Sequence, residues 1–122
     1  MPSEREGGLL AWQFRDYAER HQDKLNLWLH LYAVPAFIAG VLAAGFHLLS
    51  LNPIGALVSL VFSAAAFLVQ GLGHKREAMA PQPFDGPLDF LRRIVAEQFV
   101  TFPRFVLSGG WMRNVTRRAR HH

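Results

Sequence analysis

Residues 25–74 read LNLWLHLYAVPAFIAGVLAAGFHLLSLNPIGALVSLVFSAAAFLVQGLGH, and these fifty residues contain no Asp, Glu, Lys or Arg. The sequence on both sides is dense in charge. A soluble domain spreads charged residues along its helices to solvate their outer faces. A helix needs roughly 20 apolar residues to cross a bilayer. The stretch is long enough to cross twice, and it predicts a membrane-embedded helical hairpin.

The turn of this hairpin is predicted around Ser50, Asn52 and Pro53, between a first span at residues 25–49 and a second at 54–74. A turn this short forces the two spans to be antiparallel neighbours. Small residues recur in both spans, and small residues allow helices to approach closely in lipid. We therefore expect the two spans to pack directly against each other.

The charged flanks complete a single domain covering residues 1–122. Apolar residues at helical spacing predict an amphipathic helix over residues 9–21 and another over 88–107, followed by a basic tail at 108–122. The expected fold class is all-α: a membrane hairpin of two spans with flanking amphipathic helices, resembling a four-helix bundle.

Charge and composition also bear on location and partners. The predicted turn has no Lys or Arg, whereas the outer ends of the hairpin carry several, so the positive-inside rule predicts both termini in the cytoplasm, and the inner membrane if the protein is bacterial. The net charge is +4. Beside a membrane hairpin, anionic lipid headgroups explain the basic tail better than nucleic acid. No function is assigned to His121 and His122. Cysteine is absent, which excludes disulfides and thiolate metal ligands.

Histidines at the charged mouth of the hairpin are the candidate functional residues. His30 lies 21 residues before Leu51 and His74 lies 23 residues after it. At about 1.5 Å per helical residue, the two lie within roughly 3 Å of the same depth. His21 precedes a polar break and can fold back to that level. His47 is roughly 25 Å from His30 along the helix axis and lies outside the cluster.

Polar residues at helical spacing support the same location. Asn26 is four residues before His30, while Gln70, His74 and Glu77 follow an i, i+4, i+7 pattern. Imidazoles with a carboxylate and open positions are typical of non-heme Fe(II) oxygenases, although zinc suits the same ligands. The two amides could fix histidine tautomers. Alternatively, they hold the helices together by hydrogen bonds, and the histidines are structural.

Two motifs at the helix ends resemble a known family. HQDKLNLWLH at residues 21–30, followed by Val34 and Pro35, resembles its H-x4-N-x3-H…P signature. QGLGHKRE at residues 70–77, followed by Pro81, is similar to its second block, in which an acid and a proline follow Q-x-x-G-H. The family is named for the yeast metabolism of phytosphingosine to odd-numbered fatty acids and was long catalogued as a domain of unknown function. The resemblance covers roughly residues 17–107.

This resemblance implies a membrane-embedded Fe(II)-dependent dioxygenase that uses O₂ to remove one carbon from a 2-hydroxy fatty acid by α-oxidation. The matching catalytic iron ligands are His21, His30 and His74, with Asn26 and Gln70 as supporting groups. Glu77 matches the acid of the second block, at a slightly shorter spacing than in the fungal pattern, and is expected as a further ligand. Residues 97–104 resemble a bacterial variant of the C-terminal block and are assigned no chemistry.

Two other functions fit the same residues. A non-enzymatic membrane scaffold would bind a partner through its small-residue faces. A heme-binding bundle would use His30 and His74 as facing axial ligands.

Overall fold

The computed structural model describes residues 5 and 7–117, and the expected all-α class is confirmed: 79% of the structure is helical, and the described residues form no strand. Arg118, Arg120, His121 and His122 of the predicted basic tail lie outside the described residues. The elements in chain order are α1 (Leu9–Tyr17), the 3-10 helix η2 (Ala18–Arg20), α2 (Lys24–Leu49), α3 (Pro53–His74), α4 (Pro87–Ala96), the π-helix η3 (Glu97–Thr101), α5 (Phe102–Leu107) and α6 (Gly110–Thr116).

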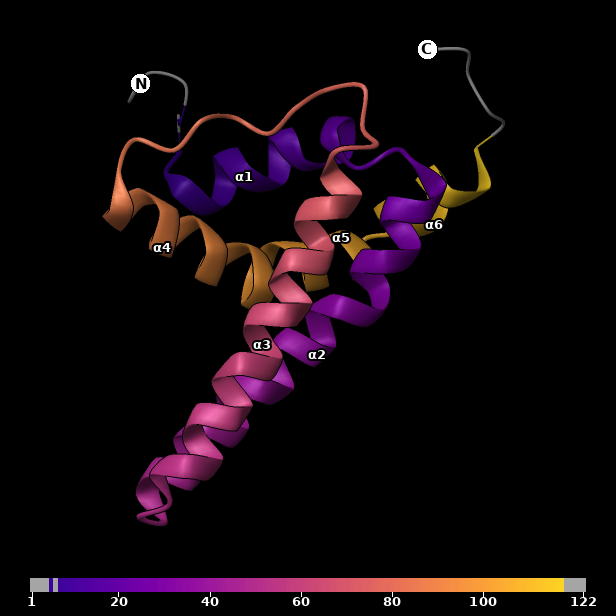
Figure 1. Cartoon of the computed structure of the whole chain (residues 1–122). Helices are drawn as coiled ribbons and strands as arrows, with labels where there is room; N and C mark the ends of the chain where they lie inside the picture. Colours follow the sequence, from indigo (N-terminus) through magenta and orange to yellow (C-terminus); the bar gives the residue numbers. More distant parts are fainter. Residues whose placement is uncertain (1–4, 6, 118–122) are drawn as a thin grey trace.

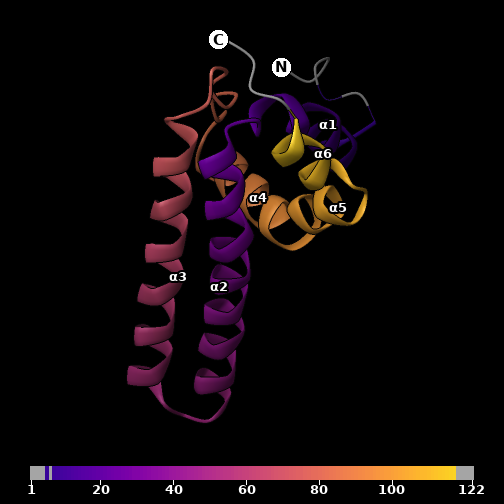
Figure 2. The ribbon, with the colours of Figure 1, turned by 90° about the vertical axis from the view of Figure 1, so that its right-hand side faces the viewer.

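The long helices α2 and α3 lie side by side and form a stem, and the short helices gather around one end of it as a head (Figures 1 and 2). This arrangement differs from the expected four-helix bundle. At about 1.5 Å per residue, α2 is roughly 39 Å long whereas α4 reaches only about 15 Å. The flanking helices are therefore too short to run along the stem, and they lie across its end.

Both stem helices are long and apolar enough to cross a membrane, judged by their length and composition. Their boundaries agree with the expected spans to within one residue. At the turn, the side chain of Asn52 accepts a hydrogen bond from the Gly55 N–H (3.0 Å), and Pro53 opens α3, where a missing N–H is harmless. Few residues of the two apolar segments are buried inside the protein.

Close packing of the stem depends on Gly40. A Cβ at this position would lie 2.1 Å from Ser63 Oγ and 2.9 Å from the Ser59 carbonyl oxygen. The Ser63 hydroxyl donates a hydrogen bond to the Phe37 carbonyl (2.8 Å), which ties the two helices together at this level. The contact is a small-residue interface of the kind that lets membrane helices approach.

We expect Gly40→Ala to destabilise the protein by about 1–3 kcal/mol, because the methyl group must push the helices apart. Gly45→Ala is the matched control, since a Cβ at Gly45 meets no atom within 4 Å. Denaturant unfolding in detergent measures both. Equal stability of the two variants would show that α2 and α3 do not approach closely at Gly40.

The C-terminal third differs from the single amphipathic helix expected at residues 88–107. Pro103 has no N–H and cannot continue a regular ladder, and just before it the Phe102 N–H donates to the Glu97 carbonyl, five residues back. The helix therefore passes through a π-helical turn between α4 and α5. The expected tail also contains α6, whose Trp111 indole N–H donates to the Leu27 carbonyl (2.8 Å). This contact fastens the tail to α2 inside the head.

Candidate metal centre

Four side chains from four separate segments meet inside the head. One potential ligand atom from each of His21, His30, His74 and Glu97 lies within 4.8 Å of the others. The centroids of the three imidazole rings are 4.7–5.0 Å apart and the rings meet edge to face. The structure therefore brings together the three histidines expected at one level. His47 lies near the stem turn, where its Nδ1 is 3.3 Å from the Asn52 side-chain nitrogen, and is not part of the group.

Backbone carbonyls set the tautomers of two of these histidines. His21 Nδ1 lies 2.8 Å from the Tyr17 carbonyl oxygen, and His30 Nδ1 lies 3.1 Å from that of Asn26. A carbonyl can only accept, so in both rings Nδ1 carries the proton and donates. The Nε2 atom of each neutral ring is then left with a free lone pair. Both Nε2 atoms are buried without a hydrogen-bond partner, and His74 Nδ1 is likewise unpartnered.

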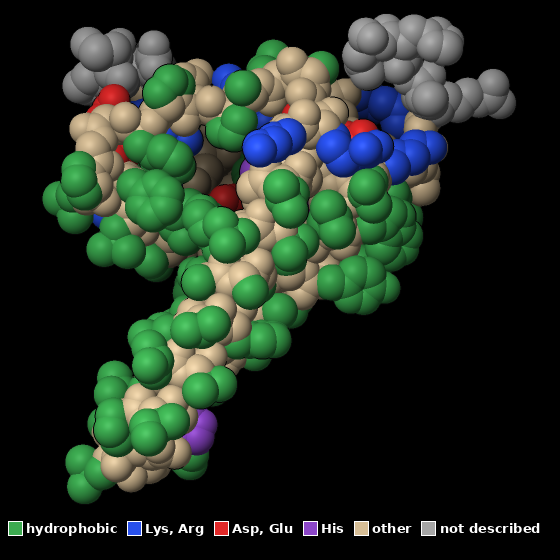
Figure 3. Space-filling view, in the orientation of Figure 1, with side chains coloured by type: hydrophobic (Ala, Val, Ile, Leu, Met, Phe, Trp, Pro, Cys, Tyr) green, Lys and Arg blue, Asp and Glu red, His purple; other side chains and the backbone are tan. Residues whose placement is uncertain are grey.

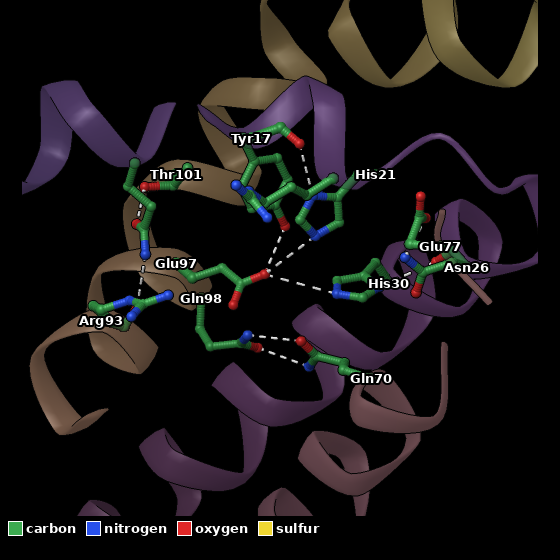
Figure 4. A network of polar contacts seen from close by, with 12 residues as sticks. Tyr17, His21, Asn26, His30, Gln70, Glu77, Arg93, Glu97, Gln98 and Thr101 are labelled. Carbon is green, nitrogen blue, oxygen red and sulfur yellow. Dashed lines mark hydrogen bonds and ion pairs between the residues drawn. The ribbon is translucent and has the colours of Figure 1, made fainter. Parts of the chain in front are cut away.

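The lone pairs converge on a negative charge. His21 Nε2 and His30 Nε2 each lie 3.7 Å from Glu97 Oε2 (Figure 4). Neutral imidazole lone pairs and a carboxylate repel one another unless a cation lies between them. Ligands around a tetrahedral first-row metal are about 3.4 Å apart at typical bond lengths. The residues present therefore fit a metal ion with only small adjustments.

Glu97 is held as an anion. Burial alone would raise the pKa of Glu97, but positive charge on the adjacent imidazoles of His21, His30 and His74 outweighs burial and lowers that pKa to about 2. When the rings are neutral, a bound metal cation would supply positive charge at the same place. The Tyr17 hydroxyl donates to Glu97 Oε2 at 2.7 Å. Burial, followed by the negative charge of Glu97, raises the Tyr17 pKa well above its ordinary value. Tyr17 is therefore a neutral donor that orients the carboxylate.

The π-helix η3 positions Glu97. Gln98, the next residue, forms two reciprocal amide hydrogen bonds with Gln70 of α3 (2.8 and 2.7 Å), and both side chains are buried. Thr101, at the end of η3, donates to the side chain of Gln13 in α1. These contacts pin the wide turn to two other helices. Such turns are rare and occur often at functional sites.

The carboxylate in the group is Glu97 rather than the expected Glu77. The Glu77 carboxylate instead accepts from the backbone N–H groups of Gln22 (2.8 Å) and Asp23 (3.0 Å) and from the Asn26 side chain (2.7 Å). The chain after His74 leaves the helical path, so the i+7 spacing does not carry Glu77 to the histidines. Glu77 braces the segment that returns His21 to the cluster.

The side chains of the two supporting amides hold segments together by hydrogen bonds, as the alternative expectation had it, and do not bind histidine rings. Asn26 holds His30 through its backbone carbonyl and uses its side-chain amide on Glu77. The paired side-chain bonds of Gln70 go to Gln98. Glu97 lies within the helix expected over residues 88–107, and that expectation contains no π-helical turn. Its only signal in the sequence was the resemblance of residues 97–104 to the family's C-terminal block.

A cavity of about 410 Å³ adjoins the group, and His21, His74 and Glu97 form part of its wall. Most of its remaining wall is apolar, including Trp12 and Phe67. Ligand sites in proteins typically measure about 300–1,000 Å³ and combine apolar walls with a few polar groups. The space-filling view shows a hollow in the head, with acidic atoms visible inside it (Figure 3).

The same geometry argues against a heme. A bis-histidine heme needs a porphyrin plane between two facing imidazoles. Here His30 and His74 meet edge to face with their ring centroids 4.9 Å apart, and His21 lies against both. No slot for a macrocycle remains between the rings.

Fold and site together define an all-helical protein with two helices able to cross a membrane and a buried His₃Glu group that could hold a metal ion. No protein-family model matches the chain, and the searches of curated proteins and solved structures gave no significant match.

Proposed function

We propose that this protein is a membrane-embedded Fe(II)-dependent dioxygenase that shortens 2-hydroxy fatty acids by one carbon. The observation that carries the proposal is the convergence of buried, unpartnered imidazole nitrogens on the Glu97 carboxylate, beside a largely apolar cavity. Histidines with a carboxylate and open positions are the ligand pattern of non-heme iron oxygenases. The two sequence motifs that resemble the dioxygenase family supply His21, His30 and His74.

The proposed reaction converts a 2-hydroxy acid and O₂ into the acid one carbon shorter, CO₂ and water. The C1–C2 bond breaks, C2 is oxidised from the alcohol to the carboxyl level, C1 leaves as CO₂, and O₂ takes up four electrons. Bound Fe(II) would supply O₂ activation and electron transfer.

The chain's own residues hold and orient the reactants. His21, His30, His74 and Glu97 would bind the metal, while the Tyr17 and Asn26 carbonyls keep two Nδ1 atoms protonated so that Nε2 faces the ion. Tyr17 fixes one Glu97 oxygen through its hydroxyl and packs its ring on His21 with centroids 3.6 Å apart. The apolar cavity wall would hold the acyl chain and exclude water.

The proposal includes insertion of the stem into a bilayer. Large apolar side chains such as Leu49, Leu57 and Leu68 are exposed along α2 and α3, and a bilayer would cover them. Lys75 and Arg76 follow the end of α3 next to the head. By the positive-inside rule, the head and both termini face the cytoplasm, and a bacterial protein would lie in the inner membrane.

The test uses protein purified in detergent, loaded with Fe(II) without oxygen and then given 2-hydroxypalmitate and O₂. We expect pentadecanoic acid and CO₂ in equal amounts, and elemental analysis to find one metal ion per chain. Bound iron without a shortened product would overturn the enzymatic proposal. Absence of any bound metal would favour the non-enzymatic scaffold, and zinc without iron would assign the site to zinc, which suits the same ligands.

A further inference from the structure

The cavity extends from the His₃Glu group toward the part of α3 that is proposed to span the membrane. On this side its wall comprises Phe67, Gln70, Gly71 and His74 of α3 and Lys75, which follows the helix. From His74 to Phe67 the helix advances seven residues toward the stem turn, or about 10 Å. One end of the cavity therefore lies at the histidines and the other lies deeper along the stem.

Aromatic rings bridge α3 and α4 at the deeper end. The rings of Phe67 and Phe90 meet edge to face with centroids 5.9 Å apart, and Phe84 contacts Phe90 at 4.9 Å. Phe90 is partly exposed. At this end of the cavity, side chains rather than closely packed backbones thus lie between α3 and α4, and rings of this kind can move aside by rotamer changes.

The outer surface at this point is apolar. Leu88, Leu91 and Val95 of α4 are exposed, and hydrophobic side chains cover the adjacent lower surface of the head and continue onto the stem (Figure 3). An amphipathic helix with such a face lies in the plane of a membrane surface. In the proposed orientation, the Phe67–Phe90 bridge would therefore open to lipid.

One positively charged side chain on the cavity wall, that of Lys75, is available to bind a ligand. Lys75 is exposed and lines the cavity, and it has no hydrogen-bond or ion-pair partner among the described residues. The other cations of the wall are engaged: Arg20 binds Asp16, and Arg93 donates to the carbonyls of Gln82 and Pro83. An anionic group entering the cavity would meet the Lys75 ammonium next to His74.

We propose that the ligand is a single-chain anionic amphiphile that enters sideways from the bilayer between α3 and α4, past Phe67 and Phe90, and binds its carboxylate to Lys75. This inference rests on the proposed function and specifies its substrate as the free acid. A neutral ester would have no carboxylate to bind to Lys75. A ligand arriving from water would not pass between Phe67 and Phe90.

Binding of radiolabelled 2-hydroxypalmitate is measured without O₂, using full-length protein in phosphatidylcholine vesicles. Because a hydrogen bond to a charged group is being removed, we expect Lys75→Gln to weaken binding by about 10-fold or more. Lys75→Arg should largely restore it, and the methyl ester should bind both the native protein and Lys75→Gln equally. Arg92→Gln, which removes an exposed charge on α4 outside the cavity wall, is the matched control.

The route is tested with Phe67→Cys/Phe90→Cys, a unique thiol pair because the natural chain has no cysteine. Joining the two thiols with a short reversible crosslinker should slow ligand binding at least 10-fold, and reduction should restore it, with bound metal unchanged. Equal rates in the linked and reduced states would overturn the lateral route, and an unaltered affinity in Lys75→Gln would overturn the carboxylate site. Tight binding without product after O₂ is added would overturn only the proposed function.

Discussion

His30→Ala is expected to abolish high-affinity metal binding, lowering the affinity by at least about 100-fold, since loss of an outer partner of a metal ligand alone costs roughly 10–100-fold. His30 is fully buried and its Nε2 has no partner other than the proposed ion. Its replacement removes one lone pair from the group, so the ion would have one ligand fewer. Metal titration of the detergent-purified protein measures the loss.

His47→Ala is the matched control, because it removes the same side chain from the same helix near the stem turn. We expect native metal binding for this variant. Thermal unfolding of both metal-free variants separates loss of a ligand from loss of the fold. A folded His30→Ala protein that binds metal as the native protein does would contradict the assignment of the centre.

Gly73→Ala is expected to disturb the same centre from outside it. A Cβ at Gly73 would lie 2.1 Å from Asn26 Oδ1 and 3.0 Å from Asn26 Cγ. Asn26 is fully buried and cannot move aside, because it is bound to Glu77 and its backbone carbonyl orients His30. We expect a destabilisation of about 1–3 kcal/mol, as for other overpacked sites.

The metal affinity of Gly73→Ala should fall by about 10-fold or more, in addition to its loss of stability. The reason is that α2 and α3 carry different ligands of the centre. Gly71→Ala provides the comparison: it lies two residues away on α3, and a Cβ there meets no atom within 4 Å. Unfolding in denaturant and metal titration are measured on both. If the two variants behaved alike, the close contact between Gly73 and Asn26 would be disproved.

Local patterns predicted the helices and part of the site. The absence of charge over residues 25–74 and the turn residues Asn52 and Pro53 determined where α2 and α3 begin and end, because both signals act within a few residues of the chain. Counting helical rise from the turn brought His30 and His74 to one level. Helical spacing does not predict the position of Glu77, because helicity ends at His74, or the packing of the head, where several short segments meet.

By itself, the sequence of this protein determined an all-helical chain with two long apolar helices and a set of histidines at one end of them. Only the tertiary structure decided which carboxylate faces those histidines, because Glu97 reaches them through a π-helical turn held by Gln70 and Gln98, residues 28 positions apart in the chain. Hydropathy and helical spacing are properties of neighbours in sequence. The position of Glu97 depends on contacts between α1, α3 and η3, which exist only after the chain has folded.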